Sequence, residues 1–285
     1  LETKRWPSPS PSPMAAKEIV LRYFNNDHDS VLLKQLGVPN SWMKEADAAV
    51  ASQRGDSWRE INALVEGELR DEAQHRMLET LVHYAVLDGS KGARKALEEM
   101  IEKFPMKYQT KGTQGPKRSL ATYREYLKIT NQDQEGEITP MLINKEYAGL
   151  PKMLGRIKDL CDELIDLDKL LSDRERELMT MMTNKKEEEE EEEGGGGSMF
   201  DNTSMHGSVK RALEIQRAAL ESMATAVIQQ WMKVVMQVSS PSHSEIVPAN
   251  ALVMRAVLDI THKLPLPDDF RLNLIQTMIP RMLSQ

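Results

Sequence analysis

The chain has 285 residues and a formal net charge of −7, from 37 Lys and Arg against 44 Asp and Glu. The seven consecutive glutamates Glu187–Glu193 account for that whole excess, so the remainder of the chain is neutral. A neutral body lacks the strong positive field that drives nonspecific nucleic-acid binding. We therefore do not expect a large basic binding face.

Membrane, redox and cofactor roles are also disfavoured by composition. No stretch reaches the roughly 18 apolar residues that span a bilayer, and the N-terminal residues are rich in Pro and Ser instead of apolar. The single cysteine, Cys161, cannot form an intrachain disulfide, and no Cys/His cluster has the spacing of a zinc site. We expect a soluble protein, nuclear or cytoplasmic, with no cofactor and no metal.

The first two segments differ sharply in pattern. Residues 1–13 include alternating Pro and Ser, which favour an extended, disordered arm. Residues 14–149 show helical spacing of apolar residues nearly throughout and no sustained alternation, which predicts one helical domain. Within it, Ser57 followed by Glu60 has the capping-box pattern that places a helix start at Ser57.

The strongest periodicity lies in residues 150–183. Apolar residues alternate at spacings of three and four, with one interruption at Arg174, which is typical of a coiled coil. A helix of this extent would be about 45 Å long. Ile165 and Leu170 widen the stripe, so one long helix of an intramolecular bundle is the alternative. The seam residues are Leu150, Met153, Ile157, Leu160, Leu164, Leu167, Leu171, Arg174, Leu178 and Met181.

Residues 184–206 form the predicted linker. Its glutamate run is followed by Gly194–Gly197, Ser198 and Met199. A Gly/Ser spacer directly before a Met is typical of an engineered joint between two polypeptides, and tethering binding partners in this way raises their effective concentration. A natural low-complexity segment is the alternative.

Residues 207–285 are predicted to form a separate three-helix module. The first helix carries a large apolar face, with Leu220, Val227, Trp231, Val234 and Met236 as the expected partner surface. Breaks follow at Pro241 and Pro265. The third helix should begin at the acidic pair Asp268 and Asp269, where negative charge suits a helix N-terminus, and end or kink at Pro280.

Two polar patterns are candidates for a binding site. Glu72, His75, Glu79 and His83 have metal-ligand spacing on one helix, but a di-iron bundle needs a second such copy, so a solvated helix face is favoured. A basic loop offers a possible nucleic-acid contact through charge and stacking, although a solvated loop is the simpler interpretation. Its residues are Lys107, Lys111, Lys117 and Arg118.

Together these patterns predict an all-α fold: an irregular helical bundle with a long coiled-coil-type helix, plus the separate module after the linker. We expect no enzyme, but a protein-protein interaction and oligomerisation scaffold whose two halves bind each other or other proteins through helical faces. The alternative is a nucleic-acid-associated assembly factor, resembling viral phosphoproteins or nucleoprotein cofactors in the order of its parts. The expected interface residues are Ile157, Leu160, Leu164, Leu167, Leu171, Leu178 and Met181, with the five residues of the partner surface.

Overall fold

The computed structural model describes Lys17, Val20 and residues 32–105, 120–132, 150–191, 202–238, 255 and 257–283, with some side chains at helix ends excluded. Throughout these ranges the regular elements are helices and none is a strand, so the predicted all-α fold class is confirmed. The predicted arm, residues 1–13, lies outside the described residues.

The chain divides into two compact units, Leu1–Leu81 and Val82–Gln285. This division falls inside the predicted helical domain of residues 14–149, because the long helices after residue 150 pack on elements that precede it. Each unit is described by itself below.

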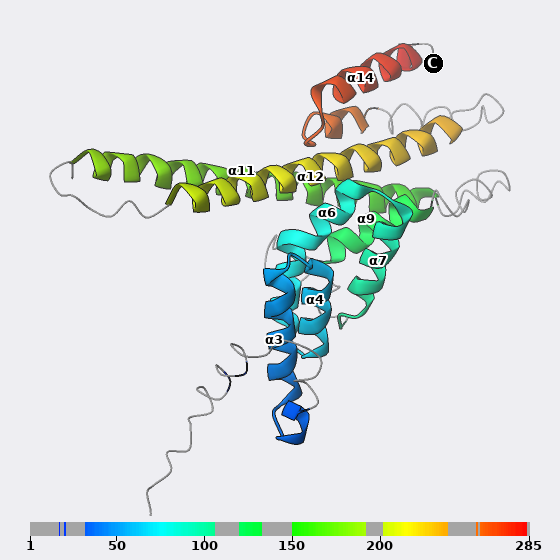
Figure 1. Ribbon diagram of the computed structural model, residues 1–285. Coiled ribbons are helices and arrows are strands. Elements are labelled where there is room, and N and C mark those ends of the chain that lie inside the picture. Colours follow the sequence, from blue (N-terminus) through cyan, green and yellow to red (C-terminus); the bar gives the residue numbers. More distant parts are fainter. Residues whose placement is uncertain are drawn as a thin grey trace, which may run out of the picture. The chain divides into compact units, whose positions relative to one another are not determined.

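The first unit contains α3 (Asn40–Gln53), α4 (Ser57–Glu66), α5 (Arg70–Arg76) and a π-helical turn, η1 (Met77–Leu81). Helix α3 packs against α4, and α4 in turn contacts α5 and η1 (Figure 1). The core of this unit comes from apolar residues at helical spacing, namely Met43, Ala46, Ala51, Ile61, Leu64, Met77, Leu78 and Leu81.

Helix α4 starts at Ser57 as expected, but the capping-box prediction of Ser57 as its N-cap was wrong by one residue. Asp56 is the N-cap, and its side chain accepts a hydrogen bond from the Arg59 backbone N–H at 3.1 Å. Ser57 is therefore the first helical residue, not the cap. Both Asp and Ser are strong N-caps, so the sequence pattern alone did not separate two adjacent candidates.

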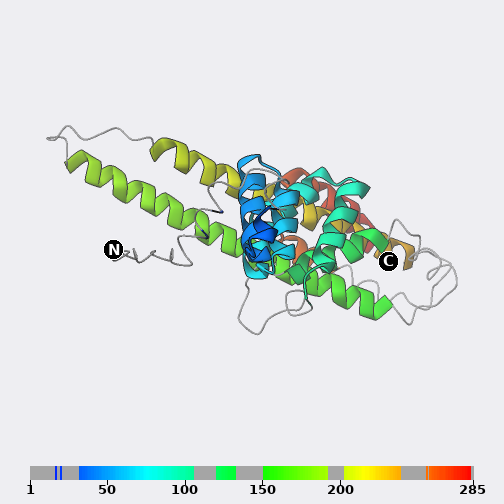
Figure 2. The same ribbon diagram turned by 60° about the horizontal axis from the view of Figure 1, so that its bottom comes forward.

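The second unit begins with three short helices: α6 (Val82–Asp88), α7 (Lys91–Glu102) and α9 (Leu120–Gln132). Helix α7 contacts both α6 and α9, and the three form a small bundle (Figure 2). The side chain of Ser90 caps α7 by accepting a hydrogen bond from the Ala93 N–H. Apolar residues from all three helices are buried together, including Val86, Leu97, Ile101, Tyr126 and Leu127.

Two long helices complete this bundle: α11 (Leu150–Glu191) and α12 (Asn202–Val238). They run antiparallel side by side (Figures 1 and 2). Helix α11 continues past the expected end at residue 183, since Lys and Glu are good helix formers and the first glycine after Gly155 is Gly194. Its 42 residues make it about 63 Å long rather than the expected 45 Å.

The chain ends in helical segments that differ in part from expectation. Residues 257–261 are helical, and α14 (Asp268–Leu283) begins at the expected acidic pair. Of the two outcomes expected at Pro280, an end or a kink, the end was wrong, because α14 continues to Leu283. Pro280 lies in the last turn, so the one backbone hydrogen bond that it cannot donate is near the helix end and not in the interior.

Cys161 is a buried packing residue of α11, with none of its surface exposed. Burial raises the pKa of its thiol to about 12, and the neighbouring Asp162 carboxylate adds to the effect. Since the thiolate is the reactive species, this cysteine is inert in the folded chain.

We expect Asp56→Ala to destabilise α4 by about 1 kcal/mol, because the Arg59 N–H loses its acceptor. Ser57→Ala, the matched control, should change stability by less than about 0.5 kcal/mol. Hydrogen exchange of the α4 amides in each variant measures the difference. Equal loss of protection in both variants would argue for Ser57 as a shared cap.

We expect Cys161 to resist Ellman's reagent at pH 8 in the native chain and to react fully once the chain is denatured. Its pKa is raised from an unfolded value of about 8.5, so its contribution to stability is complete below that pH and declines as pH rises toward about 12. Absorbance at 412 nm follows the reaction. Rapid labelling of the native chain at pH 8 would contradict the buried placement.

Candidate protein-interaction site

Helix α12 lies in a groove formed by α6, α9 and α11, which we call the α12 groove. It contacts each of these three helices (Figure 1). The groove walls therefore come from the segment before the Gly-rich linker, whereas the helix that fills the groove comes from the segment after it. The arrangement is that of a helix docked in a receptor surface.

The buried face of α12 is wide and mostly apolar. It extends over six turns, so α12 faces three neighbours at once rather than one coiled-coil partner. Trp231 is the largest of these residues and is 3 % exposed. Its indole N–H has no hydrogen-bond acceptor among the described residues. The buried apolar side chains are Leu213, Ala219, Leu220, Met223, Ala224, Val227, Ile228, Trp231, Met232 and Val234.

The seam of α11 changes character along its length. Its middle part is buried, at Ile157, Leu160, Leu164, Leu167 and Leu171. Further along, Leu178 is half-buried and Met181 is 67 % exposed. The change follows from the architecture, because this end of the α11 and α12 pair extends beyond the three short helices (Figures 1 and 2).

Polar contacts also join α12 to α11. The Arg217 guanidinium donates to the Ser172 hydroxyl at 3.3 Å and forms an ion pair with Glu175 at 3.1 Å. The Arg217 and Glu175 side chains are about one-third exposed, so such a pair contributes about 0.2–1 kcal/mol to stability. It joins the fifth turn of α12 to the part of α11 around Ser172 and Glu175.

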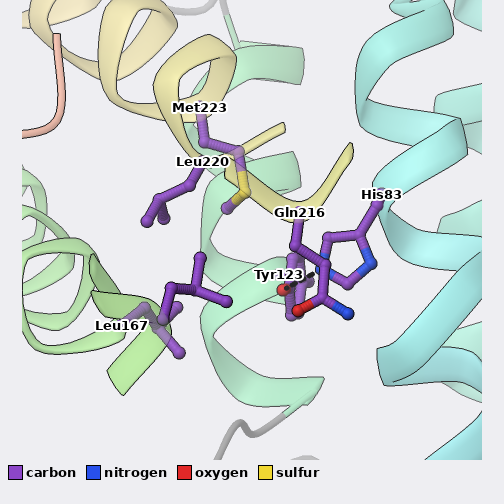
Figure 3. A pocket seen from close by; sticks show the side chains of 7 residues that line it. His83, Tyr123, Leu167, Gln216, Leu220 and Met223 are labelled. Carbon is purple, nitrogen blue, oxygen red and sulfur yellow. Dashed lines mark hydrogen bonds between the residues drawn. The ribbon is translucent and has the colours of Figure 1, made fainter. Parts of the chain in front are cut away.

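Near this pair lies a small, partly open space of about 10 Å³, close to the least volume that holds one water. Leu167 and Leu171 of α11 line it opposite Leu220 and Met223 of α12 (Figure 3). The space is too small for a metabolite. We therefore interpret it as a packing defect at the junction of four helices.

The same junction holds a buried polar cluster. The Tyr123 hydroxyl of α9 lies 3.4 Å from Nε2 of His83 on α6, and the two rings meet edge to face. His83, Tyr123 and Gln216 are each no more than 5 % exposed, and the Gln216 amide of α12 points toward the other two (Figure 3). The three residues of this cluster come from three different helices.

The predicted interface residues are distributed as follows. On α12, Leu220, Val227, Trp231 and Val234 are buried, while the side chain of Met236 lies outside the described residues. The basic loop with Lys107, Lys111, Lys117 and Arg118 also lies outside them. Whether the seam and the partner surface form an interface between molecules stays a prediction, as does the nucleic-acid alternative.

Sequence patterns missed the contribution of α6 and α9 to the site. His83 and Tyr123 were not assigned to it, since neither residue has a local pattern that indicates a long-range partner. The sequence contains a weak indication that Gln216 and Arg217 contact a neighbouring helix. Gln216 stands at an otherwise apolar position, three residues after Leu213 and four before Leu220, where a polar residue needs a partner.

The metal-like pattern gives no cluster of ligands. In the first unit, Nε2 of His75 lies 3.3 Å from Oε2 of Glu79, one helical turn away. Among the residues that the structure describes, no three His, Cys, Asp or Glu side chains gather closely enough to hold a metal ion. Likewise, none of the described helices is both long and apolar enough to cross a bilayer.

Comparison with known proteins gives one distant similarity. No family model matches the chain. The nucleoporin nup189 of Schizosaccharomyces pombe is 29% identical over 124 residues, which is 43% of this chain and 7% of the nucleoporin. The chain thus corresponds to a small part of that relative. Because the match is longer than residues 199–285, it includes part of the segment before the linker.

Proposed function

We propose that this chain is a noncatalytic helical scaffold, built around the docking of the α12 segment in the α12 groove. The observation that carries the proposal is the wide apolar face of α12, which α6, α9 and α11 cover together. Large, adaptable side chains such as Met223, Trp231 and Met232 are typical of helix-in-groove recognition. The chain thus holds a receptor surface and its helical ligand.

The similarity to a nucleoporin supports a structural role at the nuclear pore. It is also compatible with a protein whose surfaces bind other proteins rather than a small substrate. The buried polar cluster of His83, Tyr123 and Gln216 borders a space of about 10 Å³, which has no room for a metabolite. The apolar face of α12 is thus a better candidate for function than this cluster, which favours a scaffold.

The docking proposal predicts that the two segments stay together when the linker is cut. A protease site in place of Gly194–Ser198 allows the folded, full-length chain to be cleaved. We expect the fragments to coelute with the mass of the intact chain in size-exclusion chromatography with light scattering. Two separate fragments, each folded by circular dichroism, would contradict the proposal.

Matched variants locate the interface in the same experiment. Leu164→Asp and Leu171→Asp place a charge in the buried seam, which costs more than about 3 kcal/mol and weakens docking more than a hundredfold. After cleavage these fragments should separate. Met179→Asp is the control, because Met179 is 63 % exposed on the same helix, and its fragments should stay together.

The nuclear-pore assignment predicts where the chain accumulates in a cell. Fused to a fluorescent protein and expressed in fission yeast, the full chain should concentrate at the nuclear rim, where it would copurify with nucleoporins. The Leu171→Asp variant, which weakens the docking of α12, tests whether this localisation requires the docked helix. Even fluorescence through the cytoplasm and nucleus for the unmodified chain would contradict this assignment.

A further inference from the structure

The apolar residues at the contact of α11 and α12 repeat every seven residues on both helices. On α11 the repeat is Ile157, Leu164, Leu171 and Leu178, and on α12 it is Leu213, Leu220, Val227 and Val234. The structure sets Leu171 beside Leu220, so the other members pair in turn along the antiparallel helices. A shift of α12 by one heptad would again match apolar residues with apolar residues at most of these positions. The seam between α11 and α12, taken by itself, therefore does not select one register.

A set of four polar residues breaks this repetition, and we call it the polar corner. It consists of Ser172 and Glu175 on α11, with Gln216 and Arg217 on α12. Arg217 contacts both α11 residues at 3.3 and 3.1 Å. Gln216, one residue earlier, is 5 % exposed and faces His83 and Tyr123 across the junction (Figure 3). One turn of α12 thus meets polar partners from α11, α6 and α9.

Either one-heptad shift would lose these contacts. In one direction Arg217 would lie level with Met181 and Glu175 level with Met223. In the other, Arg217 would lie level with Leu167 and Glu175 level with Val209. Both shifts also move the Gln216 amide away from His83 and Tyr123, so a buried polar group would have to find a new partner.

We propose that the polar corner selects the register of the docked helix, and with it the kind of helix that the α12 groove accepts. The groove accepts an amphipathic helix that lies antiparallel to α11 and carries a large apolar residue at every seventh position. Three residues after one of these apolar residues, the helix has a side-chain amide, and the next residue is an arginine. In this chain α12 supplies that helix, with Gln216 and Arg217 following Leu213. A helix with the same apolar repeat but without this pair would dock in several registers. The inference deepens the proposed function and rests on it for any helix other than α12.

The test measures the register in the uncut, full-length chain. Spin labels are attached to Lys158→Cys on α11 and Glu214→Cys on α12, two exposed positions well separated along the helices. Cys161 can stay in place, since its buried thiol does not react. A one-heptad shift moves α12 by about 10 Å, so double electron-electron resonance would detect either direction.

We expect one distance in the otherwise unchanged chain. Arg217→Glu should raise the shifted population about tenfold or more and give a second distance about 10 Å away. Glu175→Arg should do the same, and the two changes combined should restore the single distance because the ion pair is rebuilt with reversed charges. Arg211→Glu, at an exposed position of α12 before the corner, is the control and should leave the distance unchanged.

A single native distance in Arg217→Glu would overturn the inference. A broad distribution of long distances between the labels would also overturn it. The polar corner would then determine whether α12 docks at all, and not the register in which it docks. If either charge reversal lowers the helical circular dichroism, Arg217→Met and Glu175→Gln are measured by the same criteria. Failure of the cleaved fragments to stay together would refute the proposed docking instead, so the two outcomes are distinguishable.

Discussion

The burial of α12 against three helices is the interaction on which the second unit depends. Without α12, apolar side chains of the helices that it contacts would face water, including Leu167 and Leu171 of α11. Each large apolar residue removed from water contributes about 1.5–3 kcal/mol, which is offset by the entropy lost in ordering the chain. Among the residues that the structure describes, α12 contributes ten buried apolar side chains, so its removal would expose a large part of this core.

The sequence predicted the elements of this arrangement far better than their partners. Heptad spacing is local, so the seam from Ile157 to Leu171 could be recognised without knowing what covers it. The covering surface is not local. Tyr123 and His83 come from helices with short apolar stripes of their own, and nothing in those stripes indicates which residues meet α12. The extra width of the α11 stripe was the available indication of more than one neighbour.

Helix ends were also harder to predict than helix faces. A cap depends on one hydrogen bond, and Asp56 and Ser57 offer the same chemistry one residue apart. At the C-terminal end of α11, the charge of the glutamate run and the glycines that follow it predict a linker. Glutamate has high helix propensity, so α11 continues to Glu191 although negative charge is unfavourable at a helix C-terminus. Local propensity prevailed there over electrostatic repulsion.

The linker between α11 and α12 has the same physical role whether one gene or two encoded the segments that it connects. A free α12 would expose a broad apolar face, and a free groove would expose its complement, so each segment is incomplete alone. A tether raises the local concentration of α12 near the groove but adds no directional information. Direction and register must come from the contacting residues. A repeating apolar seam cannot supply them, so a few polar side chains such as Gln216 and Arg217 carry specificity out of proportion to the stability that they contribute.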